Sequence, residues 1–176
     1  MTEEPSEKPR GESPFWRFSL RFYARPQVGF ACIALQDEAG ADVNLMLFLL
    51  YLAEQNRQVT GDDIARLDGA VHAWRERVVK PLRDLRRALK PGIGEIPFAV
   101  SENFRGQIKR LELESEQIEQ HFLERLGAET GGMQAVSRMA AAQANLAAYA
   151  AHLGGFPAEP VATILAAFAS GLRHPS

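Results

Sequence analysis

Cysteine and long apolar runs are scarce in this sequence of 176 residues. The single cysteine, Cys32, cannot form an internal disulfide, which favours a protein of a reducing compartment, the cytoplasm. The longest apolar run, at residues 43–53, has 11 residues with one asparagine among them, whereas a helix needs about 20 to cross a membrane. The first 14 residues are charged and contain no apolar core. We therefore expect neither a membrane span nor a signal peptide.

An excess of charge of either sign is also missing. The 20 basic and 22 acidic side chains give a formal net charge of -2, so no overall basic field favours binding to nucleic acid. The four histidines are scattered, and the Glu-x-x-His spacing of di-iron bundles does not occur, so no metal site and no cofactor are expected. No nucleophile elbow, phosphate-binding glycine loop or catalytic triad spacing is present. The sequence thus predicts no catalytic residue, although it does not decide whether the protein is an enzyme.

Helical periodicity dominates what the sequence does contain. Residues 1–12 are polar and rich in proline and glutamate, which predicts a disordered tail, and residues 13–176 are predicted to form a single helical domain. Capping residues followed by apolar stripes mark the helices, and no segment alternates as a strand would. The fold is predicted to be all-α, a bundle of about seven helices at residues 15–25, 27–38, 43–56, 61–90, 101–127, 132–153 and 158–172.

Two of these helices, at residues 61–90 and 101–127, are predicted to form a long antiparallel hairpin. They are similar in length, and a connection of ten residues with prolines and glycines joins them. Thr60 and Ser101 are the expected caps, and Pro81 is expected to kink the first helix. Each helix carries an apolar stripe that we expect to be buried: Ile64, Leu67, Val71, Trp74 and Val78 in the first, and Phe104, Ile108, Leu111, Ile118, Phe122 and Leu126 in the second.

Polar residues interrupt the apolar sequence between the second and third predicted helices. Gly40 is expected to end one helix and Asp42 to cap the next, with Asn44 in its first turn. Gln36 and Asp37 lie at the carbonyl end of the second helix, where an acidic side chain is electrostatically unfavourable. Asp37 therefore needs a partner, which is a basic side chain, a backbone N–H group or a ligand. The sequence leaves open whether these polar residues only cap the two helices or also bind a ligand.

A second polar feature is a stripe of seven basic residues between Arg75 and Lys90, with only two acidic residues among them. Arg83 and Arg87 are one helical turn apart and share a face, so their guanidinium groups are suited to hold a phosphate or a carboxylate. The alternative is that the stripe is solvated or pairs within the hairpin. The second helix of the hairpin offers Glu112, Glu114, Glu116 and Glu119 for such pairs.

Three segments of the chain resemble a known family. They are FWRFSLRFY at residues 15–23, LQDEAGADVNLMLFLL at 35–50 and VVKPLRDLRRALK at 78–90. They resemble an uncharacterised all-helical family of proteobacterial proteins whose most specific string is L-Q-D-x-x-G-x-x-V-N-L. Tyr51 departs from the tryptophan expected there. The resemblance implies a bacterial, cytoplasmic source and an α-helical fold, and it implies no activity.

Two functions of different classes agree with these observations. The first is non-enzymatic action through an unknown protein partner or through self-association, favoured by the two apolar stripes and by the alanines of residues 132–153, which permit close packing (Ala140, Ala144, Ala147, Ala151). The second is an enzyme or carrier that binds a small anionic or amphiphilic ligand between helices. The candidate binding residues are polar (Gln36, Asp37, Asn44), aromatic (Trp16, Tyr23, Trp74) and basic (Arg83, Arg87).

Overall fold

The computed structural model of the chain describes residues 13–130 and 132–171. These residues are almost entirely helical, and their only strands are two short segments that pair antiparallel. The predicted tail at residues 1–12 lies outside the described residues. The elements are α1 (Pro14–Tyr23), α2 (Val28–Ala39), α3 (Val43–Glu54), β1 (Arg57–Gln58), α4 (Gly61–Trp74), the π-helical η1 (Arg75–Val79), α5 (Lys80–Ala88), α6 (Phe98–Ala128), β2 (Met133–Gln134), α7 (Arg138–Leu153) and α8 (Ala158–Gly171).

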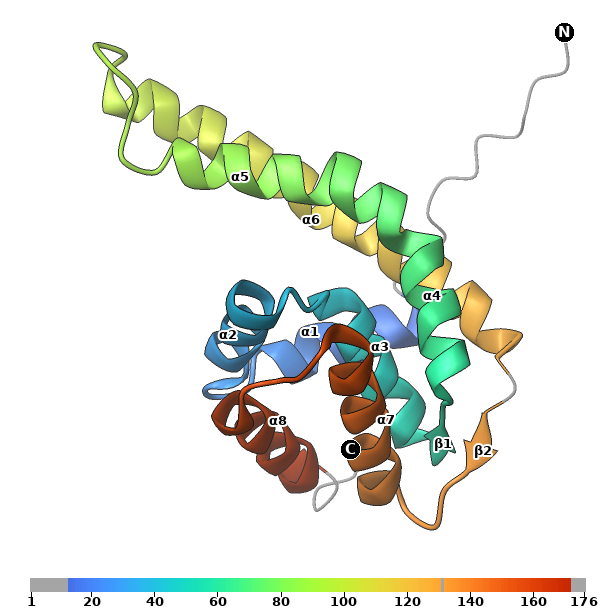
Figure 1. Cartoon of the computed structure of the whole chain (residues 1–176). Coiled ribbons are helices and arrows are strands. Elements are labelled where there is room, and N and C mark those ends of the chain that lie inside the picture. Colours follow the sequence, from blue (N-terminus) through green and yellow to red (C-terminus); the bar gives the residue numbers. More distant parts are fainter. Residues whose placement is uncertain (1–12, 131, 172–176) are drawn as a thin grey trace, which may run out of the picture.

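The helices form a body from which a long hairpin extends (Figure 1). The body contains α1, α2, α3, α7 and α8, and the hairpin is made by α4, η1 and α5 running antiparallel to α6. The all-α fold and the long hairpin predicted from the sequence are therefore confirmed. None of the described helices combines the length and the apolar character that a membrane crossing requires.

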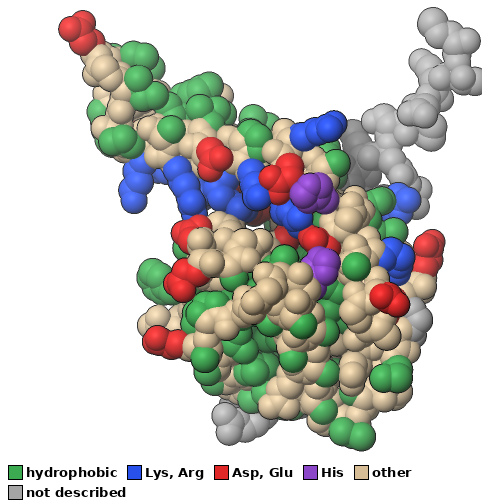
Figure 2. Space-filling view, in the orientation of Figure 1, with side chains coloured by type: hydrophobic (Ala, Val, Ile, Leu, Met, Phe, Trp, Pro, Cys, Tyr) green, Lys and Arg blue, Asp and Glu red, His purple; other side chains and the backbone are tan. Residues whose placement is uncertain are grey.

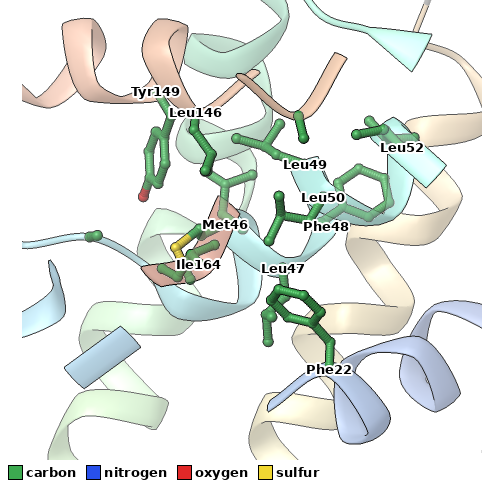
Figure 3. Close-up of a cluster of buried hydrophobic side chains, with 14 of the residues drawn as sticks. Phe22, Met46, Leu47, Phe48, Leu49, Leu50, Leu52, Leu146, Tyr149 and Ile164 are labelled. Carbon is green, nitrogen blue, oxygen red and sulfur yellow. The ribbon is translucent and has the colours of Figure 1, made fainter. Parts of the chain in front are cut away.

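Helix α3 occupies the centre of the body, because it is apolar on nearly every face. Its residues from Leu45 to Leu50 are all buried, and α7 packs along it more extensively than any other element. Figure 3 shows these side chains meeting Leu146 and Tyr149 of α7 and Ile164 of α8. The aromatic side chains of α1 cover another side of α3, where the Phe15 ring contacts that of Phe48 at 5.0 Å between centroids.

Local sequence signals set the ends of several helices, and Asp42, Thr60 and Gly40 act there as predicted. The Ser13 hydroxyl accepts a hydrogen bond from the Trp16 N–H at 3.0 Å, and Asp42 accepts from the N–H groups that begin α3. Thr60 and Asp63 form a complete capping box at the start of α4. Gly40 ends α2 with a φ of 67°, in the left-handed region that glycine tolerates.

The first arm of the hairpin, made by α4, η1 and α5, differs from the prediction at its middle. Pro81 was expected to kink it, but the irregularity precedes the proline as the π-helical turn η1, in which the Lys80 N–H donates to the Arg75 carbonyl five residues back. A π turn inserts one extra residue into the helical repeat. The apolar stripe is consequently shifted by one position, so that Val79 is buried where Val78 was predicted to be.

The second arm of the hairpin, α6, begins three residues earlier than predicted and buries a different face from the one expected. Helix α6 starts at Phe98 behind Pro97, so Ser101 is not a cap; it lies inside the helix and its hydroxyl donates to the Phe98 carbonyl. The buried side chains of α6 are mainly polar or small: Ser101, Ile108, Glu112, Ser115, Glu119, Gln120, Leu123 and Gly127. Most of the predicted apolar stripe is exposed instead: Phe104, Leu111, Ile118 and Phe122.

Burial distinguishes the faces of two other helices, α1 and α7. In α1 the side chains of Leu20 and Tyr23 are exposed, and the buried set is Phe15, Trp16, Phe18, Ser19 and Phe22. In α7 the alanines at positions 147 and 151 are exposed, whereas Asn145 is buried because its side chain bonds the backbone of Leu49, Arg57 and Val59. The alanine stripe is therefore not the packing face of α7.

Candidate functional site

The junction between α2 and α3 lies against the hairpin, and polar side chains fill the contact. Asp42 caps α3 with Oδ1, while its Oδ2 accepts from Arg75 of η1 at 2.8 Å. The same Arg75 nitrogen donates to Asp68 at 2.7 Å, and Asp68 also contacts His152 of α7. The Asp42 N–H in turn donates to the Tyr149 hydroxyl at 2.9 Å. Asp42 thus ties three parts of the fold together, since its carboxylate bonds α3 and the hairpin and its backbone N–H bonds α7.

Burial and opposite charges set the ionisation of this network. Burial alone would lower the pKa of Arg75, but Asp42 and Asp68 outweigh it and raise that pKa above its ordinary value. Burial likewise tends to raise the pKa of Asp68, and the bonds from Arg75 and His152 reverse the direction and lower it. Asp68 and Arg75 are therefore held as an ion pair.

A carboxyl group with a strongly shifted pKa lies beside this pair. Burial raises the pKa of Glu119 to about 10, and the neighbouring Asp42 carboxylate adds to the shift. Asn44 donates to Glu119 Oε2 at 3.4 Å and accepts from Gln120 at 2.9 Å. Glu119 is consequently protonated at neutral pH. A small cavity of about 80 Å³ separates Asn44 and Glu119 from the arginines of the hairpin.

The basic stripe faces the body and is largely paired within the hairpin. Arg83 donates to Gln36 at 2.7 Å, to Glu112 at 3.2 Å and to Glu116 at 2.8 Å. Arg86 forms a two-pronged contact with Glu112. Burial would lower the pKa of Arg83, but Glu116 and Glu112 raise it overall, so the guanidinium stays charged. Figure 2 shows basic side chains along the side of the hairpin that faces the body.

Asp37 has the basic partner that its position requires. Its Oδ1 lies 3.5 Å from Arg87 Nη2, and both side chains are about half exposed. The Gln36 amide donates to the same carboxylate at 3.3 Å. The contact relieves the unfavourable placement of an acid at the end of α2, although an exposed pair of this kind adds little stability.

A larger cleft of about 520 Å³ opens between α1, α2 and the hairpin. Six of the eight residues predicted as binding candidates line it: Trp16, Tyr23, Gln36, Asn44, Arg83 and Arg87. Asp37 lies outside, at the ion pair with Arg87. Trp74 is also elsewhere, half-buried within the hairpin, where its indole N–H donates to the Ser115 carbonyl at 3.0 Å. Residues of all three candidate groups thus meet at one place in the fold.

Sequence reasoning missed several polar residues of this region. Ser19 and Gln120 line the cleft, and each has an oxygen without a hydrogen-bond partner among the described residues. Lys109 lines it as well, together with Arg86, Glu112 and Glu116, which the sequence indicated only as groups that pair within the hairpin. The signal in the sequence was the row Glu112, Ser115 and Glu119, which follows helical spacing beside the apolar stripe of the same helix. No group of three or more potential metal ligands occurs within residues 13–130 and 132–171.

Comparison with known proteins places this region within a family. Neither the curated proteins nor the solved structures contain a match to the chain. A family model does match, over residues 14–123, which include α1 to α5, most of α6 and every residue that lines the cleft. This span is well over half of the chain. The chain therefore belongs to the family described as "Protein of unknown function (DUF2390)".

Proposed function

We propose that this protein acts without catalysis, through a protein–protein contact made by the outer side of the hairpin. The observation that supports the proposal is the exposure of an apolar stripe along α6, here called the outer stripe. Its five side chains are between 37% and 60% exposed: Val100, Phe104, Leu111, Ile118 and Phe122. Their spacings of four, seven, seven and four residues keep them within about 40° of one line along the helix.

The outer stripe lies on a different side of α6 from the cleft. Leu113 lines the cleft and is two residues from Leu111, which corresponds to about 200° around the helix. The apolar surface also continues onto the rest of the hairpin through four further exposed side chains: Leu85, Ile93, Ile96 and Phe98. Apolar side chains are prominent on the outer side and the tip of the hairpin in Figure 2.

The size of this surface is that of an interface. The three phenylalanines, each about half exposed, alone offer on the order of 300 Å² of apolar area, since an aromatic side chain covers about 200 Å², and the six aliphatic side chains add to it. A standard interface buries about 800 Å² on each partner. A contiguous apolar patch beyond a few hundred Å² is uncommon on a protein that acts alone.

The partner that fits the outer stripe best is a second copy of the chain. Phe104, Leu111 and Ile118 are spaced by seven residues, the repeat with which two helices pack along a shared seam. Two hairpins that meet through this seam bury the same patch on both chains, as a two-fold dimer requires. Action through self-association is therefore the form of the proposal that can be tested directly.

Analytical ultracentrifugation of three proteins tests the proposal. The unmodified chain is expected to form dimers across the micromolar range, and Leu111→Glu is expected to be monomeric with unchanged helicity by circular dichroism. Phe30→Glu is the matched control, because Phe30 is a strongly exposed apolar residue on α2, outside the hairpin, and its replacement is expected to leave the dimer intact. A monomeric unmodified chain, or an equal loss of dimer in both variants, contradicts self-association through the outer stripe.

A further inference from the structure

The cleft between α1, α2 and the hairpin has the dimensions and the lining of a small-molecule site. Its volume of about 520 Å³ lies within the range of roughly 300–1,000 Å³ that holds compact organic ligands. One wall is apolar and comes from three helices of the body, with Trp16 and Leu20 from α1, Ile33 from α2 and Leu47 from α3. The hairpin supplies the opposite wall, which is charged apart from Leu113 and Gln120.

The apolar wall is exposed within the cleft. Leu20, Tyr23, Ile33 and Leu113 are each more than two-fifths exposed, although they face a concave surface rather than an open one. Covering such side chains with an apolar group is favourable in proportion to the area removed from water. A ligand of this cleft therefore has an apolar body.

The charged wall has positive groups that the protein does not neutralise. Arg83 and Arg86 are bound to glutamates of α6, as described above, but Lys109 forms no ion pair with any residue of 13–130 or 132–171. Arg87 has only its exposed contact with Asp37 at 3.5 Å. Arg87 and Lys109 lie at nearly the same level along the hairpin. This follows from the pairs Arg83–Glu116 and Arg86–Glu112, which fix how the two antiparallel helices are aligned. These two cations are available to one anionic group.

Two nearly buried polar side chains complete the lining of the cleft. Ser19 and Gln120 are each 3% exposed. Ser19 Oγ and Gln120 Oε1 have no partner among the described residues, but both oxygens are themselves buried and do not open into the cleft. The accessible apolar side chains and the cations of the charged wall therefore define the ligand.

We infer that this cleft binds a small amphiphilic carboxylate. Its apolar body lies against Trp16, Leu20 and Tyr23, and its carboxylate is held by Lys109 and Arg87 at the rim. The glutamates of the charged wall disfavour a ligand with several negative charges, because Glu112 and Glu116 also face the cleft. This binding site is independent of the outer stripe and of the protein contact proposed above.

Titration calorimetry with three probes of equal chain length tests the charge preference. Octanoate is expected to bind, octanol to bind more weakly, and octyltrimethylammonium not to bind. The location is read from Trp16 fluorescence in the Trp74→Phe variant, in which Trp16 is the only tryptophan left. Quenching or a spectral shift that saturates together with the calorimetric signal places octanoate in the cleft.

Paired variants separate the contributions of the two walls. Lys109→Gln is expected to weaken octanoate binding about fivefold to tenfold while leaving octanol binding unchanged, since only the carboxylate uses that charge. Lys90→Gln is the matched control, because this exposed lysine of the hairpin does not line the cleft. Leu20→Gln is expected to weaken both probes, and Leu85→Gln, at a similarly exposed leucine outside the cleft, is expected to weaken neither.

Three outcomes overturn the inference. Equal affinity for octanoate and octyltrimethylammonium removes the role of the cations. Octanoate binding that survives Leu20→Gln and Lys109→Gln places the ligand elsewhere. Sedimentation with phosphatidylglycerol vesicles that Lys109→Gln abolishes, without binding of free octanoate, assigns the cations to a lipid surface instead. Octanoate binding that persists in Leu111→Glu shows that the cleft works whether or not the outer stripe forms a dimer.

Discussion

Replacing Glu119 by glutamine is expected to stabilise the protein and to change how its stability depends on pH. The folded chain raises the pKa of Glu119 from 4.5 to about 10, because the carboxyl is buried beside Asp42. Between these two pH values the native state holds a proton that the unfolded chain releases. The native state therefore binds more protons, and the free energy of unfolding falls as the pH rises through this window.

The magnitude follows from the linkage relation. One extra proton in the native state changes the free energy of unfolding by about 1.4 kcal/mol per pH unit, or about 2.7 kcal/mol between pH 6 and pH 8. At pH 7, about 2.5 units above the unfolded pKa, the unmodified protein loses on the order of 3 kcal/mol by protonating Glu119. Glutamine has the shape of the protonated acid and keeps an acceptor for Asn44. Glu119→Gln should recover most of that amount at pH 7 and only about 0.8 kcal/mol at pH 5, half a unit above the unfolded pKa.

Urea denaturation followed by circular dichroism at several pH values measures the effect. The difference in unfolding free energy between Glu119→Gln and the unmodified chain should grow by about 1.4 kcal/mol per unit from pH 6 to pH 8. Glu114→Gln is the control, since Glu114 is exposed on the same helix, and its difference should stay flat. A variant that is less stable than the unmodified chain at pH 7 would refute the reasoning. It would mean that Glu119 is ionised in the folded protein and that Arg75 depends on its charge.

Three further perturbations have defined outcomes. Gly127→Ala should destabilise the protein by about 1–3 kcal/mol in thermal or chemical denaturation, because a Cβ there would lie 2.2 Å from the Phe48 ring; an unchanged melting temperature would show that the ring moves freely. Cys32 should react with a thiol reagent only as fast as the protein unfolds, because burial raises the pKa of its thiol to about 12; rapid labelling under native conditions would contradict its burial. Asp37→Asn should change the free energy of unfolding by no more than about 1 kcal/mol, since its pair with Arg87 is half exposed; a loss above about 2 kcal/mol would require a buried charged hydrogen bond.

The helix ends were predictable because their causes are local. Ser13, Asp42 and Thr60 each satisfy backbone N–H groups within three residues, and Gly40 supplies a left-handed φ where α2 ends. Such signals need no knowledge of the rest of the fold. The central place of α3 was predictable for a similar reason, because a helix without a polar face has no side to turn toward water.

The orientation of α6 could not be predicted from its own periodicity. An apolar stripe identifies a face but does not say what covers it. In this hairpin the first arm carries Arg75, Arg83 and Arg86. The polar face of α6 lies against that arm, and its Glu112 and Glu116 pair with Arg83 and Arg86. This ion pairing leaves the apolar face of α6 on the outer side of the hairpin. A pattern restricted to one helix contains no information about this choice.

The candidate site was predictable in its residues and not in its shape. Gln36 and Asn44 attracted notice as polar residues between two apolar helices, and Arg83 as part of a basic stripe. The fold brings Gln36 and Arg83 together across 47 residues of sequence. Ser19 and Lys109 gave no such sign, since an isolated serine or lysine is ordinary on a helix. Only the packing of α1 against the hairpin gives these two a common cleft.

The π turn η1 makes the hairpin sensitive to chain length at one point. A residue removed from Arg75–Val79 would restore regular α-helix and rotate everything beyond it by about 100°, while drawing it back by about 1.5 Å. Arg83 and Arg86 would then turn away from the glutamates of α6, and the wall of the cleft would lose its charges together with its hydrogen bonds. The part of the hairpin before η1 is aligned with the body through Asp68, which contacts His152 of α7. The part after η1 is aligned with α6 through the ion pairs of Arg83 and Arg86. The one inserted residue therefore allows the continuous helix of α4, η1 and α5 to keep its contacts with the body and with α6 at the same time.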